Sequence, residues 1–259
     1  MEKETPISSP VQTLLLAVVV LLMWHSPASS ESFCTEGSLT HRVQMVLSDD
    51  LGTLDLTLCT QDAPITVENF LSYVQSGAYT NTGIIHRKVL SASYSIFQGG
   101  GYFIDTTSSG TQFLNSVVRQ NPIPMEKVLP NVAGSIAMAR TNSVDSATSQ
   151  WFINITDNPD FDSPTNEYAA FGSVSAESFT TIDAVVPIPT TSINSFFTDI
   201  PVNGYPGDGS PYPPYFVVVS EIIDLPEPSS GLQAVFAILG LGFVTRIRRA
   251  SSKGVSLHA

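Results

Sequence analysis

The sequence predicts one mainly β domain, a barrel or a sandwich, that carries two helices. Three observations lead to this expectation. Short β-rich segments recur through the middle of the chain and are separated by Gly, Ser, Asn and Pro. Two other stretches show the helical spacing of apolar residues. No internal repeat or break in composition divides residues 43–223, and 42% hydrophobic residues in a chain of 259 can form a substantial core.

The first predicted elements are a hairpin and a helix. Residues 41–59 alternate between apolar and polar side chains as two strands would, and Asp49, Asp50 and Gly52 mark the turn between them. The next segment, "APITVENFLSYVQSGAY", has apolar residues at helical spacing, a proline at its start and Gly77 near its end. We expect this segment to be the clearest helix of the chain.

The later elements are mostly short strands. The β-rich segments are "TGIIHRKVL", "YSIFQGGGYF", "GSIAMAR", "SQWFINI" and "AAFGSVS". A second, weaker helix is indicated by the spacing of Phe179, Ile182 and Val186. A proline-rich, irregular excursion follows from Pro187 to Pro214, and residues 215–223, "YFVVVSEII", are typical of a final strand.

The N-terminal segment is expected to lie outside the fold. An apolar run from Leu14 to Trp24 is followed by small residues at Ala28 and Ser30, which is the pattern of a secretory signal peptide over residues 1–30. Such a leader would be removed by signal peptidase. The acidic residues Glu2 and Glu4 are unusual in a leader, so a retained membrane anchor is the alternative.

The C-terminal segment, residues 226–259, also differs from the domain. It has a Pro-Glu-Pro motif at 226–228, a short apolar stretch over 232–244 and the cluster Arg246, Arg248 and Arg249. The stretch is shorter than the roughly 20 apolar residues that span a bilayer. This order resembles the PEP-CTERM sorting signal, which implies that an exosortase-type enzyme processes the tail and that the arginines stay cytoplasmic. The alternatives to a sorting signal are an ordinary tail anchor and a terminal core helix. We expect the folded domain to comprise residues 31–225.

Charge and cysteine content restrict the function further. Between residues 31 and 227 only six Lys and Arg stand against 21 Asp and Glu, so nucleic acid is not an expected partner. Cys34 and Cys59 can form one disulfide if the chain is exported to an oxidising compartment. Two reduced thiols are the alternative, because Cys59 follows a strand-like segment and could be a small buried hydrophobe.

Arg87 is the most informative cation, because it interrupts the β-rich segment "GIIHRKVL" in a chain with few positive charges. A guanidinium offers five fixed donors and stays charged at any working pH, so it suits a carbonyl oxygen or a distorted amide. The alternative is an outward-facing strand residue, which we also expect of its neighbour Lys88.

Five blocks together resemble a known family. The segments "TVENFLSYVQSGAYTNTGIIHR", "QGGGY", "GSIAMAR", "SQWFIN" and "YAAFG" occur in the order and approximate spacing of the cyclophilin-type peptidyl-prolyl isomerases. This resemblance covers residues 43–223. It implies a closed eight-stranded antiparallel β-barrel capped by two helices, isomerase activity on proline-containing peptides or proteins, and no metal or cofactor. From the two terminal segments we expect an exported protein of the periplasm or cell envelope that the C-terminal segment anchors transiently to the inner membrane, and we expect it to be a monomer.

The resemblance also implies roles for individual residues. Arg87 matches the family's catalytic arginine, and Gln98 matches the residue that helps to position it. The implied substrate-binding residues are Ile96, Ala139, Arg140, Gln150, Phe152, Phe161 and Tyr168. Of these, Gln150 would hold the substrate backbone and Phe152 the floor of the proline pocket, while the loop 157–162 would form one wall.

The sequence departs from the family between Arg87 and Gln98. Ten residues separate them where the family usually has seven, so Tyr94 or Ser95 matches the second apolar pocket position poorly. A non-catalytic module that binds proline-containing peptides is therefore an alternative to the enzyme. A hydrolase is disfavoured, because the chain has no G-x-S-x-G motif.

Overall fold

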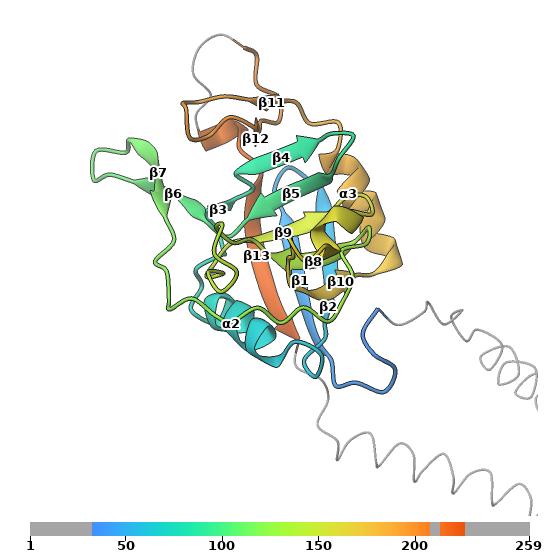
Figure 1. Cartoon of the computed structure of the whole chain (residues 1–259). Helices are drawn as coiled ribbons and strands as arrows, with labels where there is room; N and C mark the ends of the chain where they lie inside the picture. Colours follow the sequence, from blue (N-terminus) through green and yellow to red (C-terminus); the bar gives the residue numbers. More distant parts are fainter. Residues whose placement is uncertain (1–32, 208–212, 226–259) are drawn as a thin grey trace, which may run out of the picture.

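The computed structural model describes residues 33–207 and 213–225 (Figure 1). The predicted leader, residues 1–30, and the predicted sorting segment, residues 226–259, lie outside the described residues. Among the residues that are described, none of the helices has the length and apolar character needed to cross a membrane.

The described part is mainly β, as predicted, with two α-helices. The strands are β1 His41–Leu47, β2 Gly52–Leu58, β3 Gly83–Ile84, β4 Arg87–Leu90, β5 Ser95–Gly99, β6 Tyr102–Thr106, β7 Gln112–Ser116, β8 Ser135–Met138, β9 Trp151–Asn154, β10 Ala170–Val174, β11 Thr190–Thr191, β12 Ile200–Pro201 and β13 Val218–Leu225. The helices are α2 Pro64–Gln75 and α3 Phe179–Val185, and the short 3-10 helices are η1 Pro159–Asp162, η2 Ala176–Ser178 and η3 Pro213–Tyr215.

The predicted hairpin is confirmed. Strands β1 and β2 pair antiparallel from His41 opposite Leu58 to Leu47 opposite Gly52. The turn between them needs positive backbone angles, with φ of 58° at Asp49 and 56° at Asp50. Asp tolerates this left-handed region better than most residues, which explains why two aspartates stand there.

Both predicted helices are also confirmed. Helix α2 has Pro64 in its first turn and buries Val67, Phe70 and Val74 on one face. Helix α3 is shorter and buries Ile182 and Val185. Figure 1 shows the two helices on different sides of the sheet, with the β6–β7 hairpin projecting away from it.

The main sheet has eleven strands among the described residues, in the order β4-β5-β9-β8-β10-β2-β1-β13-β3-β6-β7, where the family resemblance implied eight. Strands β3 and β4 stand far apart in this order, yet only Ile85 and His86 join them. The amide of Ile85 donates to the carbonyl of Val217 beside β13 at 2.9 Å, and the amide of His86 donates to the carbonyl of Gln98 on β5 at 3.0 Å. Two residues span only about 7 Å, so the sheet must curve strongly.

Three strands were not predicted from the sequence. Strand β7 is exposed along most of its length and has no buried apolar face to reveal it. Strands β11 and β12 have two residues each and form a small separate sheet within the proline-rich excursion.

The hydrophobic residues of β5, β8 and β9 form two clusters on opposite faces. Phe97, Ile136 and Ile153 point into the main core beside Phe70 of α2. Their sequence neighbours Ile96, Ala137 and Phe152 belong to a second buried cluster. This division follows from the two-residue period of a strand, and it means that a site over the second cluster rests on the main core.

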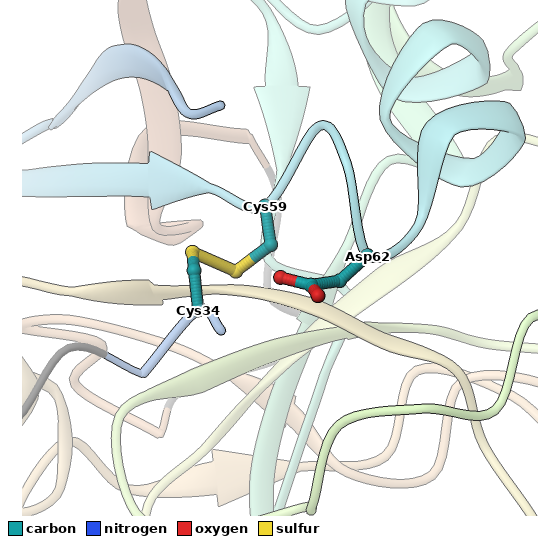
Figure 2. A group of neighbouring side chains, drawn as sticks. All are labelled: Cys34, Cys59 and Asp62. Carbon is teal, nitrogen blue, oxygen red and sulfur yellow. A yellow bond between two sulfur atoms is a disulfide. The ribbon is translucent and has the colours of Figure 1, made fainter. Parts of the chain in front are cut away.

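The second cluster also contains the disulfide. Cys34 and Cys59 are bonded and buried, with their Cα atoms 5.3 Å apart, so of the two interpretations that the sequence left open the structure has the disulfide (Figure 2). Figure 2 also shows the carboxylate of Asp62 beside the sulfurs. A disulfide offers no thiolate to a metal, and an Asp62 oxygen accepts a hydrogen bond from the Thr35 amide at 3.1 Å. We therefore interpret this trio as a structural link that holds the segment before β1.

Candidate active site

The register of four strands lines up the central residues of the site. Arg87 on β4 lies opposite Gln98 on β5, Gln98 lies opposite Phe152 on β9, and Phe152 lies opposite Ala137 on β8. Residues that are directly opposite share one face of a sheet. A guanidinium, an amide and a phenyl ring are thus placed in one row on a rigid surface.

This row borders a cavity of about 480 Å³, which we call the main cavity. Its lining residues are Arg87, Ser93, Tyr94, Ile96, Gln98, Ala139, Arg140, Phe152, Asp160, Phe161, Asn166 and Tyr168. Every residue predicted for the site lines this cavity except Gln150. Gln150 lines two adjoining cavities and is hydrogen-bonded to Gln98, so it lies at the margin of the main cavity.

Aromatic rings form the apolar part of the main cavity. Phe152 is 2% exposed, and its ring lies 5.6 Å from Phe161 and 5.5 Å from Tyr168, in edge-on geometry in both cases. Phe161 and Tyr168 are 4.7 Å apart, and Tyr94 lies 5.2 Å from Phe161. These distances are those of favourable aromatic pairs. The four rings form a preformed apolar slot that suits a small, compact aliphatic ring.

Arg87 presents its charge at the edge of this slot. Its Nη2 donates to the hydroxyl of Tyr94 at 2.9 Å, and its guanidinium carbon lies 6.0 Å from the centre of the Tyr94 ring. Within residues 33–207 and 213–225 no carboxylate forms an ion pair with Arg87. The guanidinium is therefore held in place while most of its donors stay available to a ligand.

The two glutamines of the site are linked to each other. The Nε2 of Gln98 donates to the Oε1 of Gln150 at 2.7 Å. A Cβ atom at Gly101 would lie 2.8 Å from the end of the Gln150 side chain, so a larger residue there would displace this side chain from its position. Gln98 thus fixes the Gln150 side chain through a hydrogen bond. Gln98 itself lies opposite Arg87 in the β4–β5 pairing.

The rim of the cavity is formed by Ala139 and Arg140. The amide of Ala139 donates to the carbonyl of Gln150 at 2.9 Å, which ties the rim to β9. The guanidinium of Arg140 lies 4.8 Å above the Tyr168 ring, and its Nε donates to the carbonyl of Glu167 at 2.7 Å. Arg140 is thus used to hold Tyr168 against the slot.

The loop 157–162 forms a wall, and a buried polar network holds it. Asn131 donates to the carbonyls of Phe161 and Tyr168 at 3.3 and 3.0 Å and to Asp162 at 2.9 Å. Lys127 pairs with Asp162 at 2.8 Å. Burial raises the pKa of Asp162, but hydrogen bonds from Lys127 and Asn131 outweigh it and leave this pKa below its ordinary value. The carboxylate is thus a charged anchor beneath Phe161.

The two sequence neighbours of Arg87, His86 and Lys88, do not line the main cavity. His86 is buried, and burial lowers its pKa to about 4, with the charge of Arg87 acting in the same direction. It is therefore neutral at physiological pH and adds no second charge to the site.

The expectation that Lys88 faces outward is wrong. Lys88 is 4% exposed, and its ammonium donates to the carbonyls of Val185, Val186 and Ile188, the second at 2.6 Å. The last carbonyls of a helix have no partner within the helix, so this cation caps α3. Burial lowers the Lys88 pKa.

Sequence reasoning placed some site residues only loosely or not at all. Tyr94 matched its position poorly, yet it contacts both Arg87 and Phe161. Ser93, Asp160 and Asn166 also line the main cavity. The longer segment between β4 and β5 was the available signal, because it supplies Ser93 and Tyr94 to the lining of the cavity.

The comparisons with known proteins agree with this geometry. Residues 42–204 match the family model of the cyclophilin-type peptidyl-prolyl cis-trans isomerases. The chain is 34% identical over 185 residues to peptidyl-prolyl cis-trans isomerase A of Dickeya dadantii, which covers 71% of this chain and 88% of the relative. It is 37% identical over 163 residues to isomerase cyp18 of Streptomyces antibioticus, which covers 60% and 90%.

A solved structure supports the fold. A cyclophilin-type isomerase of Cryptosporidium parvum superposes with a TM-score of 0.50 at 21% identity and covers 73% of this chain and 100% of its own. The family model extends from β1 into the proline-rich excursion and includes every residue of the main cavity. This chain therefore belongs to the cyclophilin-type peptidyl-prolyl cis-trans isomerases.

Proposed function

We propose that this protein accelerates rotation about X-Pro bonds in exported proteins and that Arg87 stabilises the twisted amide. One observation carries the proposal: the Arg87 guanidinium and the Phe152 ring stand in one cross-strand row over the same cavity. We also propose that the strongly curved sheet closes into the barrel that the family resemblance implies.

The chemistry needs only a donor and a slot. Resonance gives the peptide bond partial double-bond character and a barrier of about 18–20 kcal/mol. When the bond twists, resonance is lost and the proline nitrogen becomes a hydrogen-bond acceptor. A donor that reaches this nitrogen binds the transition state more tightly than the planar ground state, which is what catalysis requires.

The residues of the site have matching roles in this proposal. The slot formed by Phe152, Phe161 and Tyr168 holds the pyrrolidine ring, while the preceding carbonyl rotates. Gln150 holds the substrate backbone, and Arg87 donates to the proline nitrogen. Tyr94 keeps the guanidinium over the slot through its hydroxyl. The roles of Ile96, Ala139 and Arg140 are to close the walls and the rim.

The test is a protease-coupled isomerisation assay on the full-length protein and its Arg87→Ala variant. We expect Arg87→Ala to lower kcat/KM by about 100-fold, which corresponds to about 2.7 kcal/mol of transition-state stabilisation. The matched control is Arg42→Ala, because Arg42 is an exposed strand arginine that does not line any of the described cavities around Gln98. Equal rates for the wild type and Arg87→Ala would remove the assigned role of Arg87.

The same experiment separates the second candidate function. Tyr94 engages Arg87 through the unusual segment between β4 and β5. If Arg87 cannot leave Tyr94, it cannot donate to the proline nitrogen. The site would then bind proline peptides without turnover. A wild type that binds a proline peptide but leaves its isomerisation rate unchanged would establish this binding module instead.

We further propose that the protein acts as a monomer in the periplasm or cell envelope after signal peptidase removes residues 1–30. The disulfide Cys34–Cys59 supports export, because disulfides persist in oxidising compartments. An exosortase-type enzyme would process the segment 226–259. Cell fractionation combined with mass spectrometry of both termini tests this, and an uncut cytoplasmic protein would contradict it.

A further inference from the structure

A smaller cavity adjoins the main cavity at Arg87. It has a volume of about 210 Å³, and we call it the flank cavity. Its lining includes Arg87, Gln98 and Gln150, together with Phe196 and Phe197 from the proline-rich excursion, which we call its outer wall. The two cavities thus share Arg87 and Gln98. A peptide that seats its proline on Phe152 must place a neighbouring residue near the flank cavity if it continues past Arg87.

The outer wall of the flank cavity is aromatic. Tyr102 lies 4.8 Å from Phe197 and 5.8 Å from Phe196, and the two phenylalanines are 5.2 Å apart, all edge-on. Tyr102 is buried and Phe197 is half-buried, but Phe196 is 70% exposed. An exposed phenyl ring beside an active site presents apolar surface that a ligand side chain can cover.

The loop that carries Phe196 has a defined conformation. The Oδ1 of Asn194 accepts hydrogen bonds from the amides of Phe196 and Phe197 at 2.8 and 2.9 Å. The amide of Lys88 on β4 donates to the carbonyl of Asp199 at 2.8 Å. The pairing of β11 with β12 closes the base of the loop, and Figure 1 shows this pair beyond β4. The aromatic wall is therefore built onto the strand that carries Arg87.

We propose that the flank cavity is a specificity subsite that takes the aromatic side chain of a substrate residue close to the isomerising proline. This inference rests on the proposed function, because it requires the proline to occupy the main cavity. The ligand ring would pack edge-on against Phe196, as Tyr102 and Phe197 already do. The protein thereby prefers exported substrates in which an aromatic residue stands within two positions of the proline.

The experiment uses full-length protein and short peptides with one central proline. Positions on either side of the proline are changed in turn from Ala to Phe, Leu, Arg or Glu. Isomerisation is followed by exchange NMR, which needs no coupling protease, and equilibrium binding of each peptide is measured separately. We expect Phe at one position to raise affinity and kcat/KM about five-fold over Ala, as one added aromatic pair would.

The variant Phe196→Ala should abolish this preference, so that it binds and turns over the Phe and the all-Ala peptides equally well. The matched control is Phe113→Ala, since Phe113 is a 43% exposed phenylalanine on β7 that lines neither cavity. This control should retain the preference.

The outcomes keep the two proposals apart. Equal binding of Phe and Ala peptides by the wild type, or a preference that survives Phe196→Ala, overturns the subsite. A preference for Arg at every position also overturns it and would point to the carboxylate of Asp199 as the recognising group. The proposed function fails only if turnover is absent or equal in Arg87→Ala, and the binding series still tests the subsite in that case.

Discussion

The disulfide allows the most quantitative prediction about stability. Cys34 and Cys59 are separated by 25 positions, and both sulfurs are buried in the cluster beneath the main cavity. In the chain-entropy model, a loop of this length stabilises the fold by about 3.5 kcal/mol at 25 °C through its effect on the unfolded chain. Replacing both residues by Ala keeps the site apolar and should therefore lower the free energy of unfolding by about that amount.

The assay is urea unfolding of the full-length protein followed by tryptophan fluorescence, with a thermal scan as a second measurement. For a domain of this size, the loss corresponds to a fall in Tm of about 7–14 °C. Wild-type protein in strong reductant should approach the double variant, whereas reductant should leave the double variant unchanged. A double variant that unfolds within about 1 kcal/mol of the oxidised wild type would refute the loop-closure reasoning.

Two further predictions concern the site and its wall. Tyr94→Phe removes the hydroxyl that accepts a hydrogen bond from Arg87 at 2.9 Å. Because a single hydrogen bond contributes about 1 kcal/mol, this variant should lower kcat about five-fold with little change in KM. Exchange NMR measures both constants, and an equal rise in KM would instead indicate lost substrate binding. Asp162→Asn should destabilise the protein at neutral pH, because the folded pKa of Asp162 lies below its ordinary value of 3.8. The stability that this carboxylate contributes is complete at pH above its ordinary pKa and is lost as the pH falls through its folded pKa. The difference in unfolding free energy between variant and wild type, measured in urea, should therefore shrink on acidification. A difference that stays constant down to pH about 2 would contradict this reasoning.

Local features of the sequence predicted much of the fold. The Asp49-Asp50-x-Gly52 turn, the helix after Pro64 and the short strands each depend on neighbouring residues, so turn chemistry and periodicity were sufficient. The pairing of Cys34 with Cys59 was one of two open interpretations, since the chain has two cysteines in all. The five motif blocks indicated the family and the site residues.

Other features were decided by tertiary structure. Arg87 and Lys88 are consecutive cations on one strand, and the sequence cannot show which of them faces a cavity and which caps a helix, because that depends on what packs against each face of β4. The contact of Tyr94 with Arg87 likewise depends on how the longer segment folds over the β4–β5 ladder. Strand register, which brings together residues far apart in the chain, turns Arg87, Gln98 and Phe152 from separate motif residues into one surface.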